Sequence, residues 1–281
     1  MWKLPKPDIT AREAFDTCRA GIRDPDLAER LLNARGLIEE AETDFDESAE
    51  AAALLTIQAA ANVGTVTAKE MEKLYDRHMA RNKSRGRAIY DRLMIAAPFD
   101  QCPFCGHRTV STLDHTLPKA QHPALAVTPI NLIPCCKDCN HSKGNLELEA
   151  DENQLLNAYY DDVADDRWLY AEIVQGAPPG AKFFVEPPEE WEVEISVRVA
   201  NHFVKLELAK LYASQAGRQL QNIRGALGET YDAAGFEAVR DDLARRARSH
   251  ASVTVNSWEG ALYEAAAQSD WYCNGGFRAE E

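Results

Sequence analysis

Two pairs of cysteines carry the clearest metal-binding chemistry in this sequence. The segments CPFC (102–105) and CKDC (136–139) each place two cysteines three positions apart, with 30 residues between the pairs. Four thiolates can surround Zn²⁺ tetrahedrally, and such a site is structural because no position remains open for water or substrate. The sequence therefore predicts a structural zinc site with four ligands: Cys102, Cys105, Cys136 and Cys139.

A further cysteine, Cys135, stands directly before the second pair. The turn around a metal often needs a residue with positive φ after the last cysteine, and Gly106 and Asn140 occupy these two positions. This symmetry favours Cys136 over Cys135 as the third ligand. Two other interpretations are a buried set of small hydrophobic residues and a redox pair, which lacks a supporting βαβ pattern. We interpret the remaining three cysteines as core residues: Cys18, Cys135 and Cys273.

The segment between the cysteine pairs is longer than a plain zinc ribbon requires. It contains TLDHTLP (112–118) and TPINLIP (128–134), and Asn140 and Lys143 follow the second pair. With the cysteines, these residues resemble an HNH endonuclease of the ββα-metal type. The resemblance covers about residues 102–145, roughly a sixth of the chain, and rests on seven or eight unusual residues in the same order.

The resemblance to HNH endonucleases implies a role for each of several residues. Asp114 would bind a divalent metal ion, His115 would be the general base, Asn131 would orient His115, and Asn140 would be the second metal ligand. Lys119 and Lys143 would contact phosphate, unless they are solvated surface lysines. Three other histidines are interpreted as loop residues, with the last as the reserve candidate for catalysis: His107, His122 and His141.

The chemistry of phosphodiester hydrolysis agrees with these residue types. The reaction needs a deprotonated water molecule and positive charge on the phosphate and the leaving oxygen. Histidine can take that proton near neutral pH, and Asp and Asn oxygens are suitable ligands for Mg²⁺ or Mn²⁺. Because neighbouring residues on a strand point to opposite faces, Asp114 and His115 can serve one site only where the strand ends.

Charge is distributed unevenly along the 281 residues, whose net charge is −14. Residues 77–143 contain ten Lys and Arg against four acids, a balance of +6, so the remainder carries −20. One basic island in an acidic protein favours a local site for a polyanion, although RNKSRGR (81–87) would also suit a solvated helix. No apolar run reaches the roughly 20 residues of a membrane helix, and the first residues, MWKLPKPDIT, lack the charged-then-apolar order of a signal peptide. We therefore expect a cytoplasmic protein.

The flanks of the cysteine region have mainly helical patterns. Asp24 with Pro25, and Thr67 with Glu70, are typical helix starts. Helices are predicted at 47–61 and 85–96, and again from about residue 198. Short strands are predicted in WLYAEIV (168–174), AKFFVEPP (181–188) and WEVEI (191–195).

These patterns predict a mainly α fold around a small zinc-stabilised ββα-metal core with a few short strands. Three regions are expected: a helical region at 1–98, the nuclease core at 99–150, and a mainly helical α+β region at 151–281. The predicted activity is metal-dependent cleavage of DNA. The alternative is a catalytically silent, zinc-stabilised module that binds nucleic acid or protein. The sequence also resembles bacterial HNH effectors of antiphage defence systems such as Septu, which implies an ATPase as partner.

Overall fold

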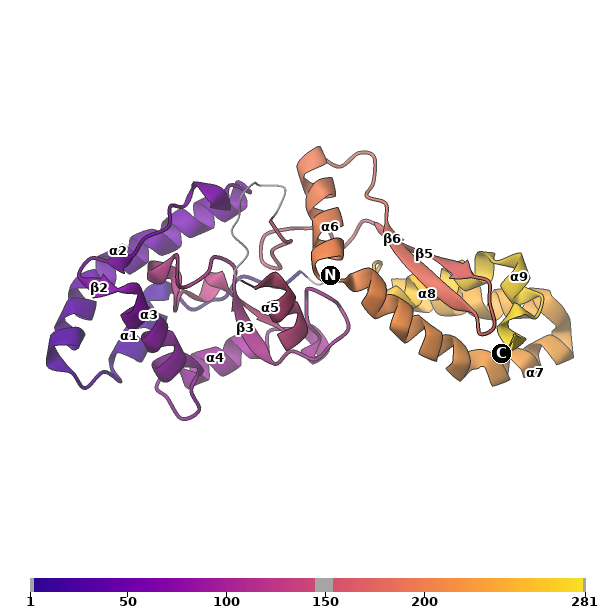
Figure 1. Cartoon of the computed structure of the whole chain (residues 1–281), viewed down its shortest axis with the longest axis horizontal. Coiled ribbons are helices and arrows are strands. Elements are labelled where there is room, and N and C mark those ends of the chain that lie inside the picture. Colours follow the sequence, from indigo (N-terminus) through magenta and orange to yellow (C-terminus); the bar gives the residue numbers. More distant parts are fainter. Residues whose placement is uncertain (1–2, 145–153, 280–281) are drawn as a thin grey trace. The chain divides into compact units, whose positions relative to one another are not determined.

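The computed structural model describes residues 3–144 and 154–279, and its contacts divide the chain into two compact units (Figure 1). The first unit comprises residues 2–161 and the second residues 162–281. The expected boundary near residue 98 falls inside the first unit, and the one near residue 150 lies outside the described residues. As predicted, helices predominate, with three two-stranded antiparallel sheets among the described residues.

The N-terminal part of the first unit consists of helices with well-defined starts. Thr10 and Thr67 each form a capping box. Asp24, which precedes Pro25, accepts hydrogen bonds from two backbone N–H groups of the first helical turn. A π-helical turn, η2, extends the third helix. The elements are α1 Ala11–Arg19, α2 Pro25–Glu50, β1 Asn62–Val63, β2 Val66–Thr67, α3 Ala68–Leu74, η2 Tyr75–Ala80 and α4 Arg87–Met94.

The helix predicted at 47–61 is wrong. Helix α2 ends at Glu50, Ala52 has a positive φ of 52°, and only a short 3₁₀ turn, η1 Leu54–Thr56, follows. Leu54 is buried in a small apolar cluster with Phe45 and Leu117. Packing of this one leucine outweighs the intrinsic helix propensity of the alanines around it.

The cysteine region forms a strand–strand–helix unit in the predicted order. Strands β3 Thr112–His115 and β4 Leu132–Cys135 pair antiparallel, with His115 opposite Leu132, and helix α5 Lys137–Lys143 follows. Two 3₁₀ turns lie in the connection between the strands, η4 Pro123–Leu125 and η5 Pro129–Asn131. Leu113 and Leu132 share one apolar core with Phe15, Ile38 and Leu74 of the N-terminal helices. The N-terminal helices therefore support the hairpin directly.

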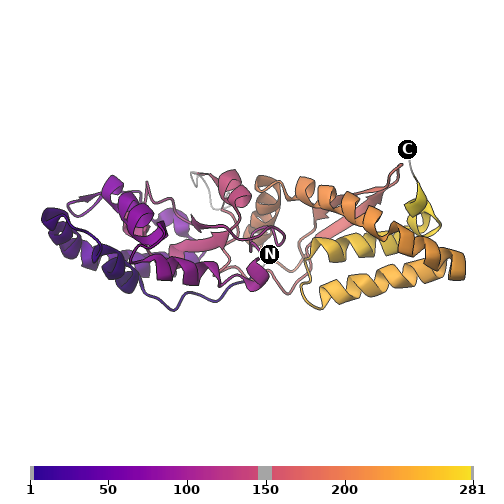
Figure 2. The same cartoon turned by 90° about the horizontal axis from the view of Figure 1, so that it is seen from below.

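The second unit packs helices against a β-hairpin. Strands β5 Leu169–Val174 and β6 Gly180–Val185 pair along their whole length, and α7 and α8 contact them. Gly235, with φ of 76°, interrupts α7, and Figure 2 shows the second part of this helix turning back along the first. The helices are α6 Val193–Lys205, α7 Leu208–Ala251, α8 Trp258–Gln268 and α9 Asp270–Cys273.

The strand predicted at 191–195 is also wrong, because α6 begins inside it, at Val193. Glu194 lies in the first turn, where the helix dipole favours a carboxylate, and Val199 and Phe203 bury one face of the helix. Five alternating residues fit a strand as well as the first turn of an amphipathic helix.

Among residues 3–144 and 154–279, no helix combines the length and the apolar character needed to cross a membrane.

Candidate metal centre and active site

The four predicted zinc ligands come together in the first unit. The Sγ atoms of Cys102, Cys105, Cys136 and Cys139 all lie within 4.8 Å of one another, and all four residues are buried. A tetrahedral Zn²⁺ site with Zn–S bonds of about 2.3 Å separates its sulfurs by roughly 3.8 Å. Residues from two distant segments thus form a group with the chemistry and the spacing to hold a metal ion such as zinc.

The two cysteine turns are built differently. Gly106 has the predicted positive φ, 59°, and its N–H donates to the carbonyl of Cys102 at 2.8 Å. The second turn is the start of α5, in which Cys136 is the N-cap and its Sγ accepts from the N–H of Cys139. Asn140 lies inside this helix, so the positive φ predicted for it is wrong. A helical start curves the backbone around the second pair of ligands without a left-handed residue.

The three cysteines outside the cluster are core residues, as predicted. Cys18, Cys135 and Cys273 are buried and are not disulfide-bonded. Burial raises the pKa of Cys18 to about 12, and burial, followed by the nearby Asp114 carboxylate, raises the pKa of Cys135. These thiols therefore stay protonated and act as small apolar side chains.

Helix α5 places two polar side chains against one face of strand β3. Lys143 Nζ lies 2.7 Å from Asp114 Oδ2, and Asn140 Nδ2 lies 3.5 Å from the hydroxyl of Thr112. Thr112 and Asp114 are two positions apart on the strand and share a face, and Asn140 and Lys143 are three apart on the helix. The predicted metal ligands Asp114 and Asn140 therefore lie on the same side of the hairpin.

Asp114 is an unusual carboxylate because its side chain is almost completely buried. Burial raises its pKa, and the ion pair and hydrogen bond with Lys143 oppose this shift. Lys143 also donates to the backbone carbonyl of His115. A buried carboxylate with a single cationic partner is costly unless it remains paired, so this position needs a cation.

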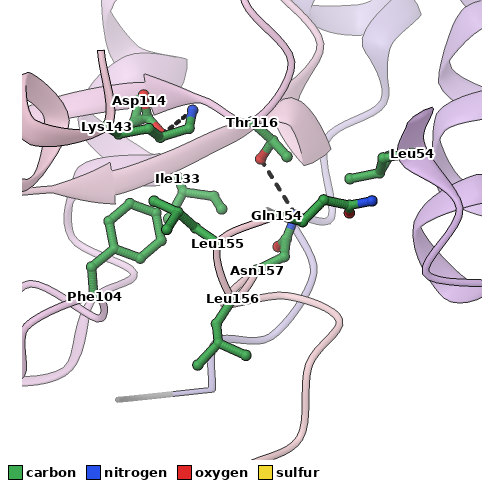
Figure 3. A pocket seen from close by; sticks show the side chains of 10 residues that line it. All are labelled: Leu54, Phe104, Asp114, Thr116, Ile133, Lys143, Gln154, Leu155, Leu156 and Asn157. Atoms are coloured by element: carbon green, nitrogen blue, oxygen red, sulfur yellow. Dashed lines mark hydrogen bonds and ion pairs between the residues drawn. The ribbon is translucent and has the colours of Figure 1, made fainter. Parts of the chain in front are cut away.

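A small pocket beside Asp114 is closed by a segment from further along the chain (Figure 3). Asp114, Lys143 and Ile133 line one side, and residues 154–157 line the other. Asn157 Nδ2 donates to the Thr116 hydroxyl at 3.3 Å, and Tyr159 OH donates to the Leu132 carbonyl at 2.8 Å. Residues after the ββα region thus form part of the wall of this site.

His115 ends strand β3 and is held by the loop between the strands. Its Nε2 lies 2.9 Å from the carbonyl oxygen of Ala126, and its ring makes an edge contact with Tyr75 at a centroid distance of 4.5 Å. Because a carbonyl only accepts, Nε2 carries the proton and the lone pair remains on Nδ1. Burial is the main cause that lowers the pKa of His115, to about 3, so the ring is neutral near pH 7.

Asn131 is buried and binds the same loop rather than the imidazole of His115. Its Oδ1 accepts from the N–H of Leu117 at 2.8 Å, and its Nδ2 donates to the carbonyls of Leu117 and Leu125. Ala126, which bonds the imidazole, is the next residue. Asn131 therefore reaches His115 through the backbone of this loop.

Replacement of Asn131 by alanine is expected to lower the free energy of unfolding by roughly 2–4 kcal/mol, because three buried backbone groups lose their partner. Denaturant unfolding of the variant measures this loss. Asn33→Ala, which removes an exposed amide from α2, is a control with the same side chain and should leave the stability nearly unchanged. Equal stability of Asn131→Ala and wild type would contradict the role of Asn131 in holding the loop.

Lys119 does not extend freely into solvent. Its Nζ lies 2.7 Å from Asp76 Oδ1 and 4.4 Å from the ring centroid of Tyr75. Tyr75 and Asp76 come from η2, and Asp76 precedes Lys119 by 43 residues, so no spacing rule connects them to this site. The candidate base His115 therefore has an aromatic neighbour, Tyr75, that residue spacing alone does not reveal.

Of the other histidines, His141 is exposed on α5, and His107 and His122 lie in loops.

Comparison with curated proteins identifies one relationship. The chain is 30% identical over 234 residues to protein ea31 of Escherichia phage lambda, and the match covers 79% of each chain. The chain belongs to the ea31 family. That name states no reaction or ligand, so the chemistry of an ea31-type protein has to be argued from the site itself. No protein-family model and no solved structure matches the chain.

Proposed function

We propose that this ea31 relative is a metal-dependent endonuclease of the HNH type that hydrolyses phosphodiester bonds of DNA. The observation that carries the proposal is the arrangement around β3. A neutral, carbonyl-bound His115 ends the strand, while Asp114 of β3 and Asn140 of α5 lie on the same side of the hairpin. A proton acceptor and two hard oxygen ligands are the combination that hydrolysis of a phosphodiester needs.

Each residue has a defined part in this proposal. His115 Nδ1 takes the proton of the attacking water, and the Ala126 carbonyl fixes the ring and its tautomer. Asp114 and Asn140 would hold one Mg²⁺ or Mn²⁺, which would supply positive charge to the phosphate and the leaving oxygen. Asp114 would exchange the ammonium of Lys143 for the ion, and Lys143 would then be free to contact phosphate.

The four-cysteine group would hold a structural Zn²⁺ in the same proposal. Two properties support this: the thiols are buried with close Sγ atoms, and all four coordination positions are filled by protein. The ion would fix α5 against the hairpin, since Cys136 caps the short helix that contains Cys139, Asn140 and Lys143. Zinc would therefore position the catalytic residues without taking part in the reaction.

Incubation of the purified chain with plasmid DNA, linear duplex, single-stranded DNA and RNA tests the activity. Cleavage is expected with Mg²⁺ or Mn²⁺ and is expected to stop when the divalent ion is removed, because in this proposal the ion supplies the positive charge at the leaving oxygen. Asp114→Ala and Asn140→Ala should each abolish it, and an exposed Asp138→Ala variant on α5 serves as the control. Binding of DNA without cutting under every metal would favour a silent binding module.

A partner protein is part of the proposal as well. From residue 162 onward the chain contains twelve Lys and Arg against twenty acids, a net charge of −8, which repels phosphate within a Debye length. Such a region suits docking on another protein, such as the ATPase of a defence complex, better than binding of DNA. Copurification with the product of a neighbouring gene tests this, and efficient cleavage by the isolated chain would count against it.

A further inference from the structure

The connection between α3 and α4 carries four exposed cations without ion-pair partners among the described residues. We name residues 77–85 the basic loop, and its cations are Arg77, Arg81, Lys83 and Arg85. No acid occurs from residue 77 to residue 90. The flanking acids are already neutralised, Asp76 by Lys119 and Asp91 by Arg87. The positive charge of this loop is therefore available to a ligand.

Other cations of the first unit are used differently. Lys6 pairs with Asp46 and Glu50, Arg30 pairs with Asp26 and Glu70, and Arg35 pairs with Asp16, so these cations are neutralised within the fold. In the basic loop the cations act on one another instead. After burial, the charges of Arg77 and Arg81 are what lower the pKa of His78. Four neighbouring cations without carboxylates repel each other, a cost that a bound polyanion removes.

The backbone of the basic loop is firmly anchored at both ends. The N–H of Gly86 donates to the His78 carbonyl at 2.8 Å, and Arg87 donates to the Ala80 carbonyl at 2.7 Å. A Cβ on Gly86 would lie 2.7 Å from Cys18 Sγ, so only glycine permits this close approach to the core. An anchored loop presents its cations with little loss of backbone entropy on binding.

The basic loop also continues directly from an element that contacts the candidate active site. Its first four residues, 77–80, belong to η2, the π-helical turn in which Tyr75 contacts the ring of His115 and Asp76 binds Lys119. Arg77 thus follows the residue in contact with the candidate base by only two positions. In Figure 1 the connection is the loop at the lower edge, between the helices labelled α3 and α4.

We propose that the basic loop binds the sugar-phosphate backbone of the nucleic acid and so positions a strand beside His115. This inference rests on the proposed function and extends it to substrate binding. Arg and Lys on phosphates carry no sequence information, so the loop contributes affinity for any sequence. With one charge per about 1.7 Å of duplex axis, DNA offers several phosphates to a nine-residue loop at once.

Binding of a fluorescent 30-bp duplex between 50 and 200 mM NaCl tests the inference, in the full chain with His115→Ala to prevent cleavage. The loop variant carries R77Q, R81Q, K83Q and R85Q. The control variant removes four exposed cations of the second unit instead: K205Q, K210Q, R218Q and R248Q. Each lost phosphate contact reduces the steepness of the negative slope of log K against log salt by about 0.9. The loop variant should therefore lose about 3 to 4 in slope and at least tenfold in affinity, and the control should resemble the parent.

Equal slopes for the loop variant and its parent would overturn the inference, as would an equal loss in the control variant. The same substitutions in an active chain separate this inference from the proposed function. A loop variant that cuts DNA as fast as wild type at limiting DNA would refute DNA binding by the basic loop and would not contradict the proposed nuclease activity. A wild-type chain that binds DNA through the loop and never cuts it would support the binding role and refute the nuclease activity.

Discussion

Replacement of His115 by alanine is expected to slow metal-dependent DNA cleavage by roughly 10²- to 10⁴-fold, the contribution of a positioned general base. Affinity for DNA should remain unchanged, because His115 is neutral and carries no charge for phosphate. Single-turnover cleavage with saturating protein measures the chemical step separately from binding. The comparison between rate and affinity is the important one, since a residue that only supports the fold would change both.

The matched control for His115→Ala is His141→Ala, which removes an exposed imidazole of α5. This variant should cut DNA at the wild-type rate. Added imidazole offers a second check: it should restore part of the rate of His115→Gly, where it can occupy the position of the lost ring, and should not affect the wild type. A His115→Ala protein that cuts as fast as wild type would falsify the assignment of the base.

Loss of the loop contact has to be separated from loss of the base. His115 Nε2 bonds the Ala126 carbonyl, so alanine at this position also frees the loop that Asn131 holds. Asn131→Ala disturbs the same loop and keeps the imidazole. If loop order alone set the rate, the two variants would lose activity together and imidazole would rescue neither.

Much of the site was predictable because its residues are close in sequence. The cysteine pairs carry the ligand type and spacing of a metal site, Asp114 and His115 are neighbours in the sequence, and the hairpin that carries them needs only two short strands. The helix starts at Asp24 and Thr67 were predictable for the same reason, since a cap is made by residues two or three positions away. Interactions between residues that are close in the sequence are the easiest to predict from a single sequence.

Contacts between distant segments were not predictable from the sequence. Tyr75 against His115 and residues 154–157 beside Asp114 depend on how helices and loops pack, and no spacing rule connects them. The pairing of Lys143 with Asp114 was missed for a related reason. The sequence pattern predicts only a phosphate contact or a surface lysine at position 143, whereas burial of the Asp114 carboxylate favours pairing with a nearby cation.

Replacement of Cys139 by serine is expected to have the largest effect on folding. The variant should lose the approximately one zinc ion per chain that a four-cysteine site holds. Structural zinc contributes about 10–16 kcal/mol to the folding of small zinc peptides, as much as the whole stability of a typical domain. Zinc content by mass spectrometry and denaturant unfolding monitored by circular dichroism give the two measurements.

Cys135→Ala is the control for this variant because it changes the residue next to the cluster. Cys135 is buried in strand β4 and lies outside the four-cysteine group. Its loss should cost about 1 kcal/mol, as for one buried methyl-sized group, and should leave the zinc content unchanged. Loss of zinc from Cys135→Ala, or full retention of zinc by Cys139→Ser, would refute the assignment of the ligands.

Zinc loss should also stop cleavage, although the four cysteines take no part in the chemistry. Cys136 and Cys139 form the first turn of α5, and Asn140 and Lys143 project from its next residues. Without zinc this seven-residue helix lacks the anchor at its start, and a helix so short is not stable alone. Excess Mg²⁺ should therefore fail to restore cleavage in Cys139→Ser, whereas readdition of Zn²⁺ to chelator-treated wild type should restore it.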